Sequence, residues 1–269
     1  MPIAVVTTRL WLLGQGIAQS PSPAMHNAAL HACGLPWTYS IHDVSPAELP
    51  EALAALRRGE VAGANVTIPH KRAVAQACDE LVGDAMATGA ANTVVVQDGR
   101  LLGHNTDALG FERALRHDGL WPAARASALI LGAGGAAAAV VLALSRAEIT
   151  TQVAARNPAA AEKLAGSVAW DADAIARAEP SLLINATPAP LHDLPVDLAA
   201  LPANCAVVDL RYHYPPDDLV PSARARGLRA ADGLEMLLQQ AMLSFELWTA
   251  RPAPIDAARS ALHAVVSTR

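Results

Sequence analysis

The chain has few lysines, few cysteines and few aromatic residues. Lys71 and Lys163 are the two lysines among 20 basic residues, and aromatic residues make up 4% of the 269 positions. The three cysteines are far apart and form no CxxC pair or metal-like spacing, so we expect reduced core thiols and no metal site. A net charge of -5 without a basic cluster argues against nucleic acid or an anionic membrane as the main partner. We therefore expect a small-molecule ligand.

Long uninterrupted apolar segments are also missing. Residues 126–145 are uncharged over a length that could span a bilayer, but Gly132, Gly134 and Gly135 interrupt the run. The N-terminal segment lacks the basic region, apolar region and cleavage site of a secretory signal. We therefore expect a cytoplasmic protein. The hydrophobic content of 52%, with 17% charged residues, excludes a disordered chain.

Alternating helix and strand signals along the chain predict an α/β fold. In residues 45–59, Ser45 and Glu48 have the spacing of a capping box. Pro46 suits the first helical position and Gly59 the end of the helix.

Further along, the pattern predicts a strand from about Thr93 to Gln97, a turn at Asp98 and Gly99, and a short second strand. A helix follows Asp107, from near Ala108 to about His117, and a new series of strands and helices then begins. We expect a domain boundary near residues 107–125. Residues 233–250 form a helix with one apolar face, so this helix packs on another element.

A dinucleotide-binding motif stands at Gly132, Gly134 and Ala137, between an apolar strand and an apolar helix. The first glycine permits a tight turn, and the second lets the backbone approach a pyrophosphate at the helix N-terminus. This strand and helix context favours dinucleotide binding over a merely tight turn.

The end of the next strand indicates which dinucleotide would bind. No carboxylate, which would hold the ribose of NAD, occurs in residues 150–161, and Arg156 is present instead. A guanidinium suits the 2′-phosphate of NADP, so NADP is favoured, with NAD as an alternative. Arg156 could also be an ordinary surface arginine at a strand end.

Polar residues gather at strand and helix ends before this motif. They would suit a polyhydroxylated, anionic small molecule, and they are Ser20, Ser22, Asn65, Thr67, Lys71, Asn92, Thr93, Asn105 and Asp107. Some have ordinary structural alternatives. Ser22 and Asp107 could be helix N-caps, and Asn65 could bond its own loop backbone. We expect His70 to be a packed histidine and His26 an exposed helix residue.

Lys71 is the candidate catalytic residue. Arginine, the usual cation of this chain, is always protonated, whereas a desolvated lysine can exchange a proton. Lys163 lies in an alanine-rich helix and reads as a solvated surface residue.

These segments, taken together and in order, resemble the shikimate dehydrogenase family, including its quinate/shikimate members. The similarity covers nearly the whole chain. It rests on Ser20–Asn27 (S-x-S-P-x-x-H-N), Asn65–Lys71 (N-V-T-x-P-x-K), Gly89–Thr93 (G-A-x-N-T), Gly103–Asp107 (G-x-N-T-D), Gly132–Ala136 (G-A-G-G-A), Asn185–Thr187 (N-A-T), Asp209–Tyr212 (D-x-x-Y) and Gly233–Gln240 (G-x-x-M-L-x-x-Q).

The resemblance implies an NADP-dependent enzyme of aromatic amino-acid (chorismate) biosynthesis that reversibly reduces 3-dehydroshikimate to shikimate. It implies a substrate-binding and catalytic domain in residues 1–107, completed by C-terminal helices in 234–269 that return to it. Residues 108–233 would form a Rossmann-like, doubly wound parallel-sheet domain. A homodimer is an expectation, with no nucleic-acid or membrane partner.

The resemblance also assigns residues to the site. Lys71 and Asp107 form the catalytic pair. The substrate would lie among Ser20, Ser22, Asn65, Thr67, Asn92, Tyr212 and Gln240. The cofactor would lie against Gly132, Ala133, Gly134, Gly135, Ala136, Arg156, Asn157, Asn185, Ala186, Thr187 and Gly233.

Two departures from the family pattern bear on specificity. Arg156 is the one arginine of the expected NADP clamp, because Ala160 occupies the position where the family usually has a second arginine. The loop after Asn185–Thr187 has Pro188 and Pro190 where the family usually has a glycine. Quinate or an amino analogue as substrate, and relaxed cofactor use, therefore stay open, as does a non-catalytic NADP(H)-binding sensor.

Overall fold

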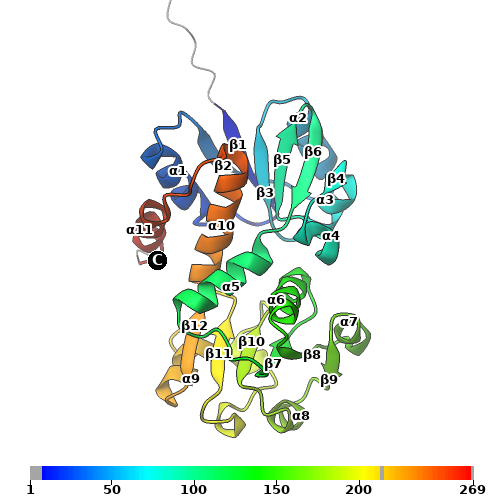
Figure 1. Ribbon diagram of the computed structural model, residues 1–269, viewed down its shortest axis with the longest axis vertical. Helices are drawn as coiled ribbons and strands as arrows, with labels where there is room; N and C mark the ends of the chain where they lie inside the picture. Colours follow the sequence, from blue (N-terminus) through cyan, green and yellow to red (C-terminus); the bar gives the residue numbers. More distant parts are fainter. Residues whose placement is uncertain (1–7, 213–214, 268–269) are drawn as a thin grey trace, which may run out of the picture. The chain divides into compact units, whose positions relative to one another are not determined.

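The computed structural model describes residues 8–212 and 215–267. The chain divides into two compact units, and Figure 1 shows the α/β class that the sequence predicts. The first unit comprises Met1–Thr106 with Leu238–Arg269, and the second comprises Asp107–Leu237. Within the described ranges, no helix is both long and apolar enough to cross a membrane. The first seven residues, where a secretory signal would begin, lie outside these ranges.

The first unit is built on a mixed six-stranded sheet. Its first three strands in the chain are parallel, and β5 runs antiparallel to both of its neighbours. The order across the sheet is β2 (Thr38–Asp43), β1 (Arg9–Gly14), β3 (Gly63–Val66), β5 (Thr93–Gln97), β6 (Arg100–His104) and β4 (Glu80–Leu81).

Helices cover both faces of this sheet. On one face, α2 (Leu49–Arg57) and α3 (Lys71–Ala77) bury an apolar cluster with β1, β3, β5 and β6. On the other, α1 (Ser22–Ala32) packs against β2 and against α11 (Ile255–Val266). The indole of Trp248 near the end of α10 (Leu234–Thr249) donates to the Val94 carbonyl at 2.9 Å. Residues from Leu238 onward therefore belong to the first unit.

Two local predictions have different outcomes. Strand β5, the turn at Asp98 and Gly99 with positive φ of 52° and 75°, and strand β6 are confirmed. Helix α2, however, begins at Leu49 rather than at Pro46. The Ser45 backbone N–H and hydroxyl both donate to the Glu48 carboxylate, at 2.8 and 2.7 Å. The residues between them form a turn that precedes the helix.

The second unit is built on an all-parallel six-stranded sheet. The order across it is β12 (Arg229–Asp232), β11 (Ala206–Asp209), β10 (Leu182–Asn185), β7 (Ser127–Leu131), β8 (Thr150–Ala154) and β9 (Gly166–Val168). From β7, the chain builds outward first through β8 and β9 and then through β10 to β12 (Figure 1). The strand order therefore reverses between β7 and β10. Ligands of such sheets bind outside the carboxyl ends of the strands at this switch point.

Alternate residues of each strand face different helix layers. Ala128 and Ile130 of β7 join a cluster with α5 (Asp107–His117) and α6 (Gly135–Arg146). Leu129 and Leu131 join another with α8 (Ala172–Arg177) and α9 (Leu219–Ala225). Both faces are thus covered, as a doubly wound sheet requires. Remaining short elements are α4 (Asp84–Thr88), α7 (Pro158–Glu162), η1 (Leu191–Asp193) and η2 (Leu198–Ala200).

Candidate active site

The turn between β7 and α6 has the geometry of a dinucleotide site. Gly132 has φ of +104°, and a Cβ built on it would lie 2.7 Å from the Thr187 methyl carbon. A Cβ on Gly134 or Gly135 would meet no atom within 4 Å. Gly134 is the N-cap of α6, and glycine has no side chain that could occupy the N–H groups at the helix start. Open backbone at the N-terminus of a twelve-residue helix fits a pyrophosphate.

The alanines of this turn differ in exposure. Ala133 and Ala136 are half-buried beside the open glycines. Ala137 is fully buried in the cluster between the sheet and α6, where a small residue lets helix and strand approach closely.

The end of β8 carries the predicted NADP clamp. Arg156 is exposed and stands two residues beyond Ala154, the last residue of β8. The Asn157 side chain accepts a hydrogen bond from the Ala160 N–H at 3.3 Å and so caps α7. Asn157 therefore has a structural role, and cofactor contact by it stays a prediction.

Asn185 organises the loop that follows β10. This fully buried side chain accepts hydrogen bonds from the Thr187 N–H at 3.0 Å and hydroxyl at 2.7 Å. Its amide donates to the Ala189 carbonyl at 3.2 Å and to Asp209 at 3.1 Å. These bonds hold the turn around Ala186 and Thr187.

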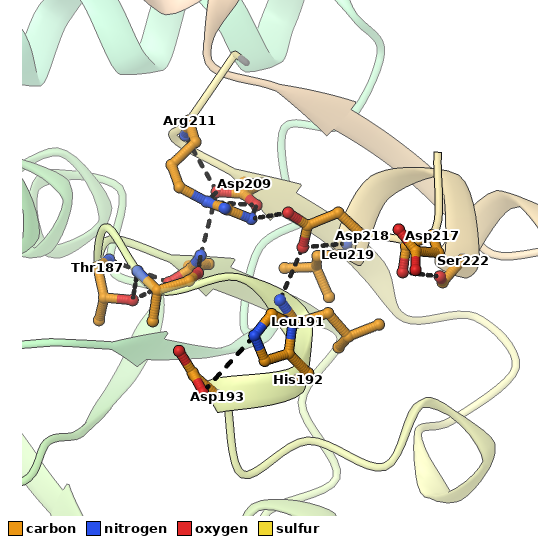
Figure 2. Close-up of polar contacts among 12 residues, drawn as sticks. Thr187, Leu191, His192, Asp193, Asp209, Arg211, Asp217, Asp218, Leu219 and Ser222 are labelled. Carbon is orange, nitrogen blue, oxygen red and sulfur yellow. Dashed lines mark hydrogen bonds and ion pairs between the residues drawn. The ribbon is translucent and has the colours of Figure 1, made fainter. Parts of the chain in front are cut away.

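Three charged residues beside this loop were not identified from the sequence (Figure 2). The Arg211 guanidinium donates from Nε and Nη2 to the Asp209 carboxylate, with a shortest distance of 2.6 Å, and pairs with Asp218 at 2.9 Å. Both carboxyl groups are buried. The only sequence signal was Asp209, the fixed acidic residue of the D-x-x-Y motif; Arg211 occupies a variable position of that motif, and Asp218 lies outside it.

Burial acts to raise the pKa of both carboxyl groups, but the net shift differs between them. Burial raises the pKa of Asp209, and the hydrogen bonds from Arg211 oppose that shift. Burial also works to raise the pKa of Asp218, but hydrogen bonds from Arg211 and from the N–H groups of Leu191 and Leu219 lower it below its ordinary value.

Gly233 and Tyr212 lie near the ends of β12 and β11. A Cβ on Gly233 would collide with the Leu210 carbonyl, so the close approach of these two segments requires glycine. The Gly233 N–H donates to the Arg211 carbonyl at 3.0 Å. Tyr212 is half-buried, three residues after the end of β11. Ligand contacts by Gly233 and Tyr212 stay predictions.

In the first unit, the two motif serines meet at the start of α1. Ser20 donates through its hydroxyl to the Ser22 hydroxyl at 3.1 Å and accepts from the Ser22 N–H at 3.3 Å. Ser22 is the first residue of α1, and the N-cap is Pro21, without a side-chain cap bond. The alternative that Ser22 caps the helix is therefore wrong.

Asn65 makes wider contacts than its own loop, which corrects the structural alternative for it. Its Oδ1 accepts from the Tyr39 hydroxyl at 2.9 Å. Its Nδ2 donates to the Asn92 carbonyl, the Thr93 hydroxyl and the Ser244 hydroxyl, the last at 2.9 Å. Asn65 joins β3, β5 and α10.

Asn92 and Gln240, two predicted substrate residues, come together. Asn92 Nδ2 donates to Gln240 Oε1 at 3.3 Å and to the Thr106 hydroxyl at 2.8 Å. Thr106 and Ser244 both donate to the Gln240 carbonyl at 3.0 Å. Sequence reasoning missed Thr106 and Ser244 as supports, although Ser244 is four residues after Gln240, on the same helix face.

Thr67 and Lys71 flank the short segment between β3 and α3. A Cβ built on Gly14 would lie 2.6 Å from the Thr67 methyl carbon. Lys71 is half-buried, begins α3 and accepts at its carbonyl from the Ala91 N–H at 3.0 Å. Asp107 is 5% exposed and begins α5 of the second unit.

His26 and His70 are both buried. His70 is packed, as expected, with Nε2 2.7 Å from the Val44 carbonyl oxygen. The expectation that His26 is exposed is wrong, because this ring is fully buried and stacks on Tyr39 at 4.1 Å between centroids. The Trp248 ring is tilted relative to His26, with 5.4 Å between the two centroids. Burial lowers the pKa of His26 to about 3.

Comparisons with known proteins agree along the chain. The shikimate dehydrogenase substrate-binding domain matches residues 12–94, and the shikimate 5′-dehydrogenase C-terminal domain matches 233–263. A shikimate dehydrogenase (NADP(+)) of Methylobacterium radiotolerans is 42% identical over 91% of this chain and 93% of its own. One from Thermus thermophilus is 41% identical over 90% and 92%.

Solved structures give the same result. Shikimate 5-dehydrogenase from Thermus thermophilus, in complex with NADP(H) and shikimate, has a TM-score of 0.87 at 36% identity and covers 96% of this chain and all of its own. Quinate dehydrogenase from Corynebacterium glutamicum, in complex with NAD, has a TM-score of 0.84 at 33% identity, covering 96% and 99%. The chain therefore belongs to the shikimate dehydrogenase family.

Proposed function

We propose that this protein catalyses the reversible, NADP-dependent reduction of 3-dehydroshikimate to shikimate. The observation that carries the proposal is the 42% identity to a curated NADP-dependent shikimate dehydrogenase over nine-tenths of both chains. The open Gly134–Gly135 backbone at the start of α6 supports the nucleotide half of this activity. This activity belongs to aromatic amino-acid biosynthesis.

The substrate residues are proposed to act as a fixed set of hydrogen-bonding groups. Ser20, Ser22, Thr67, Asn92 and Gln240 would bind the hydroxyl and carboxylate groups, together with Asn65 and Tyr212. The contacts among Asn65, Asn92 and Gln240 hold these side chains before a substrate arrives. Such preorganisation reduces the ordering cost of binding.

Lys71 and Asp107 are proposed as the catalytic pair. NADP(H), when bound, accepts or supplies a hydride. Lys71 would deliver the proton to the oxygen of the ring carbonyl during reduction and remove it during oxidation. Asp107 would hold the substrate hydroxyl and keep the ammonium group of Lys71 oriented.

The cofactor is proposed to lie along one edge of the parallel sheet. The turn Gly132–Ala136 would hold its pyrophosphate, with Arg156 and Asn157 at the ribose phosphate. Asn185, Ala186, Thr187 and Gly233 would flank the nicotinamide. Because guanidinium binds phosphate in a forked geometry, Arg156 favours NADP over NAD.

A quinate/shikimate or aminoshikimate activity with relaxed cofactor use is the second candidate. Arg156 lacks the companion arginine expected near position 160, where Ala160 instead donates its N–H to Asn157. A quinate dehydrogenase in complex with NAD has the same fold at 33% identity. One cation gives a weaker preference for the 2′-phosphate than two.

Initial rates at 340 nm with shikimate and quinate, each with NADP and with NAD, test the proposal. We expect the highest kcat/KM with shikimate and NADP. A higher value with quinate or NAD would support the second candidate. Dinucleotide binding without turnover of any of these substrates would contradict an enzyme and favour the sensor.

A cytoplasmic location and a homodimer complete the proposal. Light scattering on the eluting peak of a sizing column measures the mass directly. A mass near 28 kDa would contradict the dimer, because one chain has a mass of 27.9 kDa.

A further inference from the structure

The 185–191 loop, which runs from the last residue of β10 to the first residue of η1, lies against the nucleotide turn. The Thr187 methyl carbon and the Ala186 carbonyl oxygen lie 2.7 and 3.3 Å from where a Gly132 Cβ would stand. The Ala186 N–H donates to the carbonyl of Leu131, the residue before Gly132, at 2.9 Å. A shift of this loop therefore changes the wall beside the first glycine of the motif.

Both ends of the loop are held by buried carboxylates. At its start, Asn185 donates to Asp209 Oδ1 at 3.1 Å. At its end, the Leu191 N–H donates to Asp218 Oδ1 at 2.7 Å. Neither carboxylate belongs to the loop itself.

Arg211 joins these two carboxylates (Figure 2). Its guanidinium makes a two-pronged contact with Asp209 and an ion pair with Asp218. The Arg211 side chain is 18% exposed, and those of Asp209 and Asp218 are 0% and 1% exposed. Removing the cation would leave two buried acidic groups without their charge partner, which is strongly unfavourable.

We propose that Arg211 is a positioning residue for cofactor binding. Through Asp209 and Asp218 it holds both ends of the 185–191 loop, so that Thr187 stays against Gly132 and leaves the nucleotide turn open. This inference rests on the proposed function, because it assigns the loop to the NADP side of that site. The 185–191 loop contains Pro188 and Pro190 and no glycine. In this proposal its position is fixed by side chains that lie outside the loop.

The test is NADPH binding without substrate, followed by nucleotide fluorescence, in Arg211→Met and Arg211→Lys. We expect Arg211→Met to raise the Kd for NADPH about tenfold, the scale of one charge-assisted contact. Lysine retains the charge without the fork, so Arg211→Lys should recover part of the affinity. The KM for shikimate at saturating NADP should change less than about twofold, because Ser20, Asn65 and Asn92 are held by contacts within the first unit.

Arg224→Met is the matched control. Arg224 donates through Nε and Nη2 to the Ala230 carbonyl, and among the residues that the structure describes no hydrogen bond or ion pair joins it to the loop. This variant should lose stability without a change in the Kd for NADPH. Asp218→Asn is a second test variant. The oxygen of the asparagine amide can still accept a hydrogen bond from the Leu191 N–H, but the amide NH2 group is a donor and would face the donor groups of Arg211.

The outcomes separate this inference from the proposed function. An unchanged Kd in folded Arg211→Met, or an equal rise in Arg224→Met, would overturn the positioning role. If Arg211→Met does not fold, Asp218→Asn decides, with a raised Kd supporting the role and an unchanged Kd overturning it. Failure of the unaltered protein to bind NADPH would overturn both this role and the proposed function.

Discussion

The two units present their proposed ligand groups in different ways. In the first unit, Asn65, Asn92 and Gln240 are side chains held by hydrogen bonds to other side chains and to backbone. In the second, Gly134 and Gly135 offer backbone beside open space. A cyclic polyol is recognised by fixed donors and acceptors, whereas a pyrophosphate is recognised by helix N–H groups that need room around them.

The catalytic step can also be tested separately from ligand binding. Lys71 is the proposed proton donor, so its replacement tests the chemistry alone. We expect Lys71→Ala to lower kcat by about 10²–10⁴-fold, the usual contribution of a general acid or base, with little change in substrate affinity. Asp107→Asn should disturb both kcat and KM. Steady-state rates at 340 nm measure these effects.

The other lysine is the control for that experiment. Lys163 is exposed just after α7, and Lys163→Ala should leave both parameters unchanged. Near-normal turnover in purified Lys71→Ala would remove the lysine from the mechanism.

Two glycines of one turn should respond differently to alanine. Gly132→Ala combines a φ of +104° with a contact at 2.7 Å, so we expect a loss of about 1–3 kcal/mol in the free energy of unfolding. Gly134 has extended backbone with φ of -87° and ψ of -170°, and its Cβ would meet nothing. Gly134→Ala should change the free energy of unfolding by less than about 0.5 kcal/mol.

Urea unfolding of both variants measures this difference. Equal losses of stability would show that the space beside Gly134 is not open in the folded protein.

The side-chain network of the first unit depends on Ser244. This buried hydroxyl accepts from Asn65 at 2.9 Å and lies 2.7 Å from the Thr93 hydroxyl. Ser244→Ala leaves buried polar groups without a partner, so we expect a loss of about 1–3 kcal/mol in stability and a raised KM for shikimate. Urea unfolding and initial rates measure the two effects.

Ser222, which donates to the Asp217 carbonyl at an exposed site, supplies the control. Ser222→Ala should change the stability by less than about 0.5 kcal/mol. An unchanged KM in Ser244→Ala would mean that Gln240 keeps its position without this hydroxyl.

His26 gives the first unit a specific sensitivity to acid. Its pKa is lowered from 6.5 to about 3 by burial, so the folded state favours the neutral ring. The unfolded chain binds the proton more readily between these values, so this stability is complete above pH 6.5 and falls as the pH drops toward 3. Urea midpoints at several pH values should fall less steeply in His26→Phe. His31→Gln, at an exposed position of α1, should leave the slope unchanged.

The fold was largely predictable from the sequence because its signals are local. The strand and turn at Thr93–Gly99, the helix Asp107–His117 and the glycine turn after β7 each follow from short patterns, and the structure confirms them. The helix start at Leu49 was missed because Glu48 bonds Ser45 outside the helix instead of inside its first turn.

The supports of the site were less predictable because they depend on distant residues. His26 is buried by Tyr39 and Trp248, which lie 13 and 222 positions away along the chain. Arg211 acquires its role only when β11 and the start of α9 bring Asp209 and Asp218 to one guanidinium. The motifs do not predict these sites, because Tyr39, Trp248 and Asp218 lie outside the motif segments that contain His26 and Arg211.

Separate calorimetric titrations of NADPH and shikimate into Gly134→Ala test most directly whether the two ligand sides are built independently. A Cβ at this position should block the approach of the pyrophosphate, so we expect the Kd for NADPH to rise at least about tenfold while the Kd for shikimate stays unchanged. Unchanged NADPH binding, or an equal loss of both ligands, would contradict the account.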